Sequence, residues 1–172
     1  MDKLVCKKVF IYGVPGSGKT SLSQKIADDL NLPLFEADGL KDKFRKLTTK
    51  EESPFLFLGT SQAFSFFGDL NTENVIRGLK AVRVALSDVV NKEVQSHDEV
   101  VEGAFLDPNL LKNYGKLILV ITSDEKQHRN QFFKHRENNE TSLEEFKAAR
   151  IIQDFLINEA KNLGVEIMEN NK

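Results

Sequence analysis

The chain has 172 residues, 29% of them charged and 40% hydrophobic, which is ordinary for one globular domain. Its 24 basic and 26 acidic residues give a formal net charge of −2, so no basic field indicates nucleic-acid binding. The single cysteine, Cys6, excludes an intrachain disulfide and a cysteine-based zinc site. The sequence has no signal-peptide core and no apolar run long enough to span a membrane, so we expect a cytoplasmic protein.

Strand-like and helix-like segments alternate along the chain, and no repeat or linker divides it. The expected elements, in chain order, are strand 8–12, helix 20–30, strand 34–37, helix 39–47, helix 72–95, strand 99–102, strand 117–122, helix 124–136, helix 142–163 and strand 165–168. Near-continuous apolar strands are typical of a parallel sheet that is covered on both faces. We therefore predict an α/β fold in which residues 1–172 form one domain, with three layers (α/β/α) around a five-stranded parallel sheet.

The residues between the first strand and the first helix form a phosphate-binding motif. The run Gly13-Val14-Pro15-Gly16-Ser17-Gly18-Lys19-Thr20 has the G-x-x-x-x-G-K-T spacing of a P-loop, so the fold is expected to be that of a P-loop NTPase. Glycines let backbone N–H groups converge on phosphate oxygens, and the helix that follows favours the same anion. We expect Lys19 to reach the β- and γ-phosphates of ATP and the Thr20 hydroxyl to ligate Mg²⁺. The predicted nucleotide-binding residues are Gly13, Pro15, Gly16, Ser17, Gly18, Lys19, Thr20 and Ser21.

Two carboxylates follow predicted strands at the edge of the sheet where ligands bind in parallel α/β proteins. Glu102 ends the third strand, and we expect it to hold Mg²⁺, directly or through water, or to orient the acceptor. Asp38 ends the second strand, and we expect it to accept the proton of an attacking hydroxyl group. The alternatives are structural, because Glu102 would close a loop and Asp38 would cap the helix that begins at Gly39.

A polar bend between the last two predicted helices is expected to belong to a short helical lid over about residues 125–142. Arg129 and Arg136 lie seven residues apart, on roughly one face of a helix that leads into this bend. A mobile arginine at that place would neutralise charge on the transferred phosphoryl group, so both are predicted to be catalytic. Arg150, on the last helix, would reach the lid or the nucleotide. A solvent-exposed helix face is the alternative position for Arg129.

Residues from about 39 to 72 are predicted to form an insertion on the acceptor side of the site. Lys41 and Arg45 are one helical turn apart, a spacing that suits a phosphate or a carboxylate, although ordinary surface charge is the alternative. Five phenylalanines lie between Phe55 and Phe67, interrupted by a glycine, so this stretch is not one regular strand. We expect it to form an apolar floor beneath the acceptor, with an oligomer contact as the alternative.

Beyond the P-loop, nearly the whole chain resembles the kinase domain of the 2-phosphoglycerate kinase family. The run Asp38-Gly39-Leu40-Lys41-Asp42-Lys43-Phe44-Arg45 is similar to that family's Asp-x-x-Arg-x-x-x-Arg segment. The run Val101-Glu102-Gly103-Ala104-Phe105-Leu106-Asp107-Pro108 is similar to its Ile-Glu-Gly-Val-His-Leu-x-Pro segment. Shorter similarities cover Thr60-Ser61-Gln62-Ala63, Val75-Ile76-Arg77-Gly78 and the end of the chain from Phe146.

The sequence departs from the family pattern at three positions. Lys41 replaces the first arginine of the acceptor segment, Phe105 replaces a histidine, and Gln131 falls near an expected arginine of the lid helix. The amino-terminal extension of longer family members has no counterpart in this sequence. Loss of a cationic or hydrogen-bonding group at the acceptor affects which anion is recognised.

The resemblance implies a nucleoside-monophosphate-kinase-like or shikimate-kinase-like fold that transfers the γ-phosphoryl group of MgATP to a small anionic metabolite such as 2-phosphoglycerate. It also implies that Asp38, Lys41, Arg45 and Gly103 bind the acceptor. A nucleoside monophosphate kinase or a shikimate- or gluconate-like kinase is an alternative. From another class, the alternative is an ATP-binding regulatory or interaction module without turnover. We expect a small-molecule partner, no nucleic acid or membrane, and a monomer or a homodimer.

Overall fold

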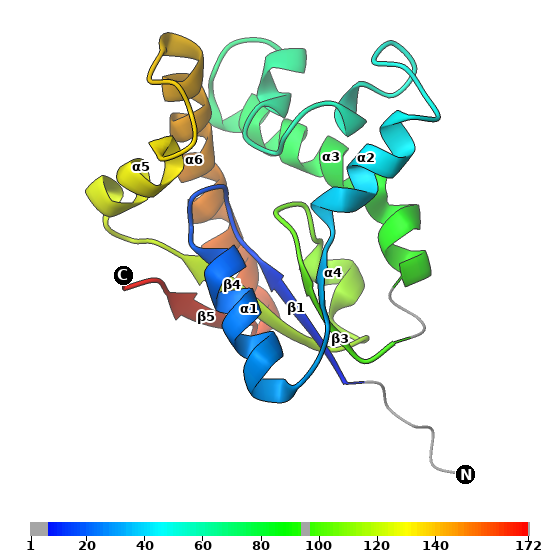
Figure 1. Ribbon diagram of the computed structural model, residues 1–172. Coiled ribbons are helices and arrows are strands. Elements are labelled where there is room, and N and C mark those ends of the chain that lie inside the picture. The colour runs from blue at the N-terminus through cyan, green and yellow to red at the C-terminus, as the bar shows by residue number, and fades with distance from the viewer. Residues whose placement is uncertain (1–6, 94–96, 172) are drawn as a thin grey trace.

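The computed structural model describes residues 7–93 and 97–171 and has strands and helices that alternate as the sequence predicts (Figure 1). The elements are β1 (Lys8–Tyr12), α1 (Lys19–Leu30), β2 (Leu34–Glu36), α2 (Asp38–Arg45), η1 (Pro54–Leu56), η2 (Ala63–Phe66), α3 (Thr72–Glu93), β3 (Glu99–Glu102), α4 (Pro108–Leu111), β4 (Lys116–Ile121), α5 (Glu125–Phe133), α6 (Glu140–Leu163) and β5 (Glu166–Glu169). The last two residues expected in the helix 72–95 lie outside the described residues.

The five strands form one parallel sheet in the order β2-β3-β1-β4-β5, which confirms the predicted fold class. β1 lies at the centre, and all five of its residues are buried. After β1 the chain forms β2 and β3 on one side of it and then β4 and β5 on the other. The direction in which strands are added to the sheet therefore reverses at β1. Ligands bind outside the carboxyl ends of the strands at such a reversal.

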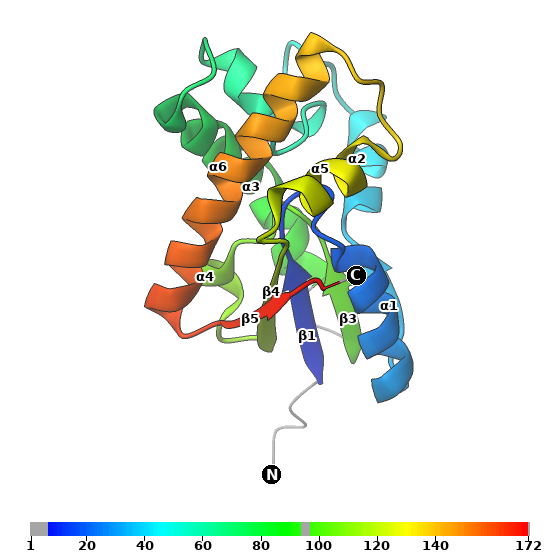
Figure 2. The ribbon, with the colours of Figure 1, turned by 90° about the vertical axis from the view of Figure 1, so that its left-hand side faces the viewer.

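Side chains of the central strands point alternately to two apolar cores, one on each face of the sheet. Val9 and Ile11 pack with Ala27 of α1 on one face. Phe10 and Tyr12 pack on the other face with residues of α3 and α6. Figure 2 shows the sheet between α1 on one side and the pair α3 and α6 on the other, which is the predicted three-layer arrangement.

The lid region differs from the expectation at both of its helix ends. α5 ends at Phe133 instead of residue 136, and α6 begins at Glu140 instead of 142. The side chain of Asn139 accepts a hydrogen bond of 2.9 Å from the N–H of Ser142 and so caps α6. The helix therefore begins two residues earlier in the chain than expected. The short helix α4 was not predicted, although Asp107 caps it and Pro108 occupies its first position.

The phenylalanine-rich stretch is built from two short 3₁₀ helices, η1 and η2. η2 packs against α3, where Gly78 lies so close that an added Cβ atom would come within 2.7 Å of the Ala63 carbonyl carbon. Phe64 is buried there, whereas Phe66 is exposed. Within the described residues, no helix combines the length and the apolar character that crossing a membrane requires.

A buried ion pair joins α3 to α6 behind the sheet. Nη1 and Nη2 of Arg83 each lie 3.0 Å from a carboxylate oxygen of Glu159, which also accepts a hydrogen bond from Asn109. The Arg83 side chain is only 4% exposed. Such a pair stabilises little relative to apolar residues, but the loss of one partner leaves a buried charge uncompensated.

We therefore expect Arg83→Met to lower the free energy of unfolding by about 3–5 kcal/mol in denaturant titrations. The double variant Arg83→Met, Glu159→Leu removes both charges and should recover most of that loss. Lys116→Ala, which breaks the exposed pair with Glu166, is the control and should cost no more than about 1 kcal/mol. Equal losses from Arg83→Met and Lys116→Ala would contradict this account.

Candidate active site

The P-loop connects β1 to α1 and packs against α5. Gly16 and Gly18 have φ angles of 77° and 88°, which side chains rarely allow. An added Cβ atom at Gly16 would come within 2.9 Å of the backbone of Phe132. Only glycine at this position lets the loop lie against α5, so Gly16, which occupies a position that the G-x-x-x-x-G-K-T pattern leaves open, has a packing reason of its own.

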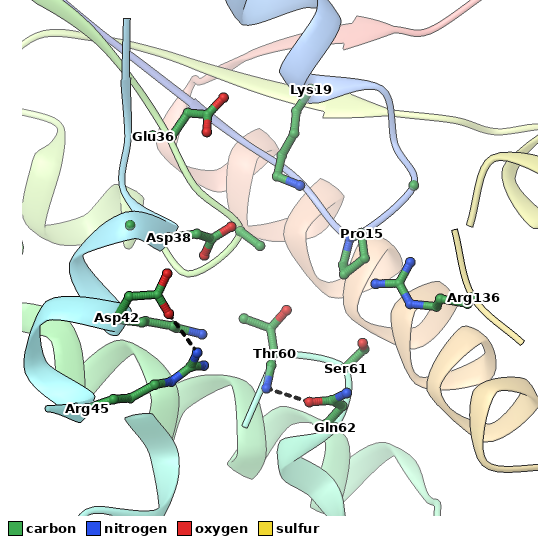
Figure 3. Close-up of a pocket in the computed structure, with 15 residues that line it drawn as sticks. Pro15, Lys19, Glu36, Asp38, Asp42, Arg45, Thr60, Ser61, Gln62 and Arg136 are labelled. Atoms are coloured by element: carbon green, nitrogen blue, oxygen red, sulfur yellow. Dashed lines mark hydrogen bonds and ion pairs between the residues drawn. The ribbon is translucent and has the colours of Figure 1, made fainter. Parts of the chain in front are cut away.

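Two cavities open on either side of this loop. The first, of about 650 Å³, lies between the P-loop, α2 and the segment 59–62 (Figure 3). The second, of about 640 Å³, lies between the start of α1, the end of α5 and Asn170. Gly16, Lys19 and Arg136 line both cavities. A group that passes between the two cavities would therefore pass these residues.

Lys19 and Glu102 form an ion pair beneath the first cavity. Nζ of Lys19 lies 3.7 Å from a carboxylate oxygen of Glu102, and both side chains are largely buried. Burial raises the pKa of Glu102 and nearby Lys19 opposes the shift, while Asp38 and Glu36 add to it. Since three carboxylates gather near one lysine, a further cation would be favoured here.

Thr20 and Glu102 fit the predicted Mg²⁺ site only with ligands from outside the protein. Among the described residues, no group of three or more His, Cys, Asp or Glu side chains could hold a metal ion. Mg²⁺ ordinarily keeps several waters and binds through one or two protein groups plus phosphate oxygens, which agrees with so sparse a set. Thr20 lines the second cavity beside Ser21.

Asp38 lines the first cavity and faces Lys19 (Figure 3). It is the first residue of α2, whose cap residue is Ala37, and no side chain caps this helix. The alternative that Asp38 is a helix cap therefore has no support in the structure. Its neighbour Gly103 is buried, and an added Cβ atom would come within 3.0 Å of Ala37. Gly103 thus allows β3 and the start of α2 to approach, rather than lining the cavity itself.

Lys41 and Arg45 line the wall of the first cavity opposite the P-loop. Nζ of Lys41 donates a hydrogen bond of 3.3 Å to the Leu58 carbonyl and lies 5.3 Å from the ring centre of Phe105. Burial lowers the pKa of Lys41, an effect that Asp38 opposes. Nε of Arg45 donates a 2.7 Å bond to the Leu56 carbonyl, and Nη1 pairs with Asp42 at 3.0 Å. Both cations are thus held in place before any ligand binds.

The four predicted arginines divide into two groups. Arg136 stacks on the ring of Phe132 at 4.1 Å, donates a bond of 2.9 Å to its carbonyl and, like Arg45, faces the first cavity. Arg129 and Arg150 line neither cavity at the P-loop. The prediction placed Arg129 and Arg136 on one helix face. Because α5 ends at Phe133, Arg136 lies beyond the helix and faces elsewhere.

Sequence reasoning missed a buried histidine that joins the P-loop to α5. Nε2 of His128 is 2.9 Å from the Pro15 carbonyl, and Nδ1 is 3.3 Å from Nη1 of Arg150. A carbonyl only accepts and a guanidinium only donates, so the neutral ring with the proton on Nε2 satisfies both. Burial lowers the pKa of His128; the hydrogen bond with the Pro15 carbonyl opposes this shift, and the charge of Arg150 adds to it. No spacing in the sequence pairs His128 with Pro15.

Further site residues missed by sequence reasoning line the two cavities. Those in the first are Glu36, Asp42, Thr60, Ser61 and Gln62, and those in the second are Gln131, Lys134, His135 and Asn170. The resemblance over 60–63 was the signal for Thr60, Ser61 and Gln62. Nothing local in the sequence marks Asn170, which reaches the P-loop only because β5 joins the sheet beside β4.

A protein-family model, described as the ATPase family associated with various cellular activities (AAA), matches residues 9–147. Among curated proteins, the chain is 25% identical over 180 positions to the 2-phosphoglycerate kinase of Methanocaldococcus jannaschii, covering 95% of this chain and 58% of that protein. The chain therefore spans less than two-thirds of that relative's length. It is 27% identical to the mevalonate-3-phosphate 5-kinase of Thermoplasma acidophilum, covering 91% and 85% of the two chains.

Among solved structures, the shikimate kinase from Acinetobacter baumannii in complex with shikimate is similar in fold. It has a TM-score of 0.61 and 16% identity, with 98% of this chain and 86% of that chain covered. The resemblance to 2-phosphoglycerate kinase and to the shikimate-kinase-like fold group, inferred from sequence, is thus confirmed.

The environment of His128 predicts how stability depends on pH. Since its pKa is lowered in the folded state, the unfolded chain binds a proton first as pH falls below about 6.5. Unfolding free energy should therefore fall on acidification, by at most about 1.4 kcal/mol per pH unit, until His128 titrates in the folded state. Denaturant titrations at several pH values between 7.5 and 5.5 measure this loss of unfolding free energy. The loss should be smaller in His128→Gln and the same as in the wild type in the control His97→Gln, which changes an exposed histidine. An unchanged slope in His128→Gln would refute the assignment.

Proposed function

The chain belongs to the ATPase family associated with various cellular activities (AAA), and on this premise we propose that it is an ATP-dependent kinase of a small metabolite. The observation that carries the proposal is the meeting of two cavities at Lys19 and Arg136. A kinase needs one site for the nucleotide and one for the acceptor, with the transferred group between them. The kinase relatives support this function.

The second cavity suits the nucleotide. Its wall includes the end of the P-loop with Thr20 and Ser21, so ATP would lie there with its phosphates against the loop and the α1 terminus. Bound Mg²⁺ would supply charge neutralisation for the phosphates, with Thr20 and Glu102 as its protein-side partners. The γ-phosphate would then reach the boundary at Lys19 and Arg136.

The first cavity suits an anionic acceptor. Both relatives are named for acceptors that already carry a phosphate, 2-phosphoglycerate and mevalonate 3-phosphate, and each of these compounds also bears a carboxylate and a free hydroxyl group. Lys41 and Arg45 are cations on the wall opposite the P-loop, and each is held in place by a hydrogen bond that it donates to a backbone carbonyl. We therefore propose a phosphorylated hydroxy acid as the substrate class, with its anion at Lys41 and Arg45.

Transfer would then follow from the positions of three side chains. Asp38 accepts the proton of the acceptor hydroxyl as that oxygen bonds to the γ-phosphorus and the bond to the β-phosphate oxygen breaks. Lys19 and Arg136 neutralise charge on the phosphoryl group during the transfer. The polar bend after α5 carries Arg136, so movement of this bend would exclude water from the reacting group.

Turnover tests the proposal directly. With MgATP and a panel of phosphorylated hydroxy acids, we expect one acceptor to stimulate ADP release stoichiometric with its phosphorylation. Asp38→Asn should lower kcat by about 10²-fold or more with little change in ATP affinity, because the proton acceptor is lost. Lys19→Ala should abolish transfer. Failure of the whole panel would favour the ATP-binding module without turnover, and an unchanged kcat in Asp38→Asn would remove Asp38 from the mechanism.

Arg45 gives a test of the acceptor position. Loss of one charge-assisted hydrogen bond costs about 1.5–3 kcal/mol, so Arg45→Ala should raise the acceptor KM by about 10- to 100-fold and leave the ATP KM nearly unchanged. Lys43→Ala, an exposed cation on the same helix that does not line the cavity, is the matched control. Equal effects of the two variants on the acceptor KM would place the acceptor's anion elsewhere.

A further inference from the structure

A third cavity of about 350 Å³ lies on the α5–α6 side of the molecule, apart from the two at the P-loop. α5 and α6 border it, together with Leu70 from the segment before α3. It shares no lining residue with either P-loop cavity. Arg129 and Arg150, the two predicted arginines that line neither P-loop cavity, both line this one.

The charges around this cavity are predominantly positive. Arg129, Lys147 and Arg150 line it against one carboxylate, that of Glu125. Among the described residues, none of the three cations has a carboxylate within ion-pair distance. A net charge of about +2 in a concave site, uncompensated by the protein, attracts small anions.

The two arginines are held in place without a ligand. The guanidinium of Arg129 lies 5.2 Å from the ring centre of Phe133 and 5.9 Å from that of Phe146. Arg150 donates hydrogen bonds of 2.8 Å and 3.2 Å to the carbonyls of Thr122 and Ser123. Guanidinium groups that are already oriented lose little side-chain entropy when they bind an anion.

The rest of the lining is apolar and comes from Leu70, Leu143, Phe146 and Ile151. An inorganic ion would leave this surface exposed to water, whereas an ion with a compact hydrocarbon or aromatic body would cover it. We propose that this cavity is a second ligand site, which binds a small organic phosphate with its charged group at the three cations and its body on the apolar surface.

The site is connected to the P-loop through Arg150. The same guanidinium group contacts His128, whose ring is hydrogen-bonded to Pro15, and it also binds the carbonyl of Thr122, whose hydroxyl donates a 3.1 Å bond to Ser17. A ligand that joins Arg129 on α5 to Lys147 and Arg150 on α6 fixes the two helices that the polar bend connects. The bound phosphate thus acts as a regulator, and by reciprocity nucleotide and regulator change each other's affinity by one common factor.

The test is calorimetric titration of phenyl phosphate into the full chain saturated with MgADP, which occupies the P-loop. We expect a saturable binding event that Arg45→Ala retains, which separates it from the acceptor cavity, and that Lys147→Glu weakens about tenfold or more, because this change makes the third cavity nearly neutral. Lys161→Glu is the matched control on the same helix, since Lys161 is exposed and does not line the cavity, and it should bind like the wild type. Arg129→Gln is the second variant and should also weaken binding.

Three results would overturn the proposal. The first is the absence of saturable binding at about 10 mM phenyl phosphate. The second is equal weakening of binding by Lys147→Glu and Lys161→Glu. The third is binding that is lost in Lys19→Ala but unchanged in Lys147→Glu. An MgADP affinity unaffected by phenyl phosphate would overturn the regulatory part. The readout is binding, so it holds whether or not the chain proves to be a kinase.

Discussion

The packing of the P-loop against α5 is the contact on which both cavities at the active site depend. Gly16 approaches the backbone of Phe132 so closely that a Cβ atom has no room, and the Pro15 carbonyl accepts a hydrogen bond from His128 one helical turn earlier. Phe132 in turn carries the guanidinium group of Arg136 on its ring. One contact thus fixes the P-loop, α5 and the cation between the two cavities.

Buried polar groups extend this contact to the far helix. Gln153 of α6 forms two hydrogen bonds of 3.0 Å with the backbone N–H and carbonyl of Thr122, just beyond β4. The Thr122 hydroxyl donates to the P-loop at Ser17. Each of these groups would cost about 1–3 kcal/mol if it were buried without a partner, so α6 has one favourable position relative to the sheet. The position of α6 follows from this network as much as from apolar packing.

The first cavity is organised differently, by charges that the fold orients in advance. Lys41 and Arg45 are anchored by the carbonyls of Leu58 and Leu56, so the chain between α2 and α3 determines where the two cations point. Phe105 replaces the histidine of the 2-phosphoglycerate kinase pattern that the sequence resembles. Its ring lies beneath Lys41 and contacts the cation with its face, where a histidine could form a hydrogen bond. A cation over an aromatic face keeps its charge available to an anion on its other side.

The sequence by itself determined the alternation of strands and helices, the parallel sheet and the P-loop, because apolar periodicity and glycine spacing are local properties. It also marked Asp38, Lys41, Arg45 and Arg136 as candidate site residues, from a strand end, a spacing of one helical turn and a polar bend; all four line the first cavity. Only the tertiary structure decided the rest. α5 ends one turn early and sends Arg129 and Arg136 to different cavities, and β5 brings Asn170 to the P-loop from the end of the chain. These outcomes depend on helix ends and on contacts between distant segments, which no local pattern in the sequence encodes.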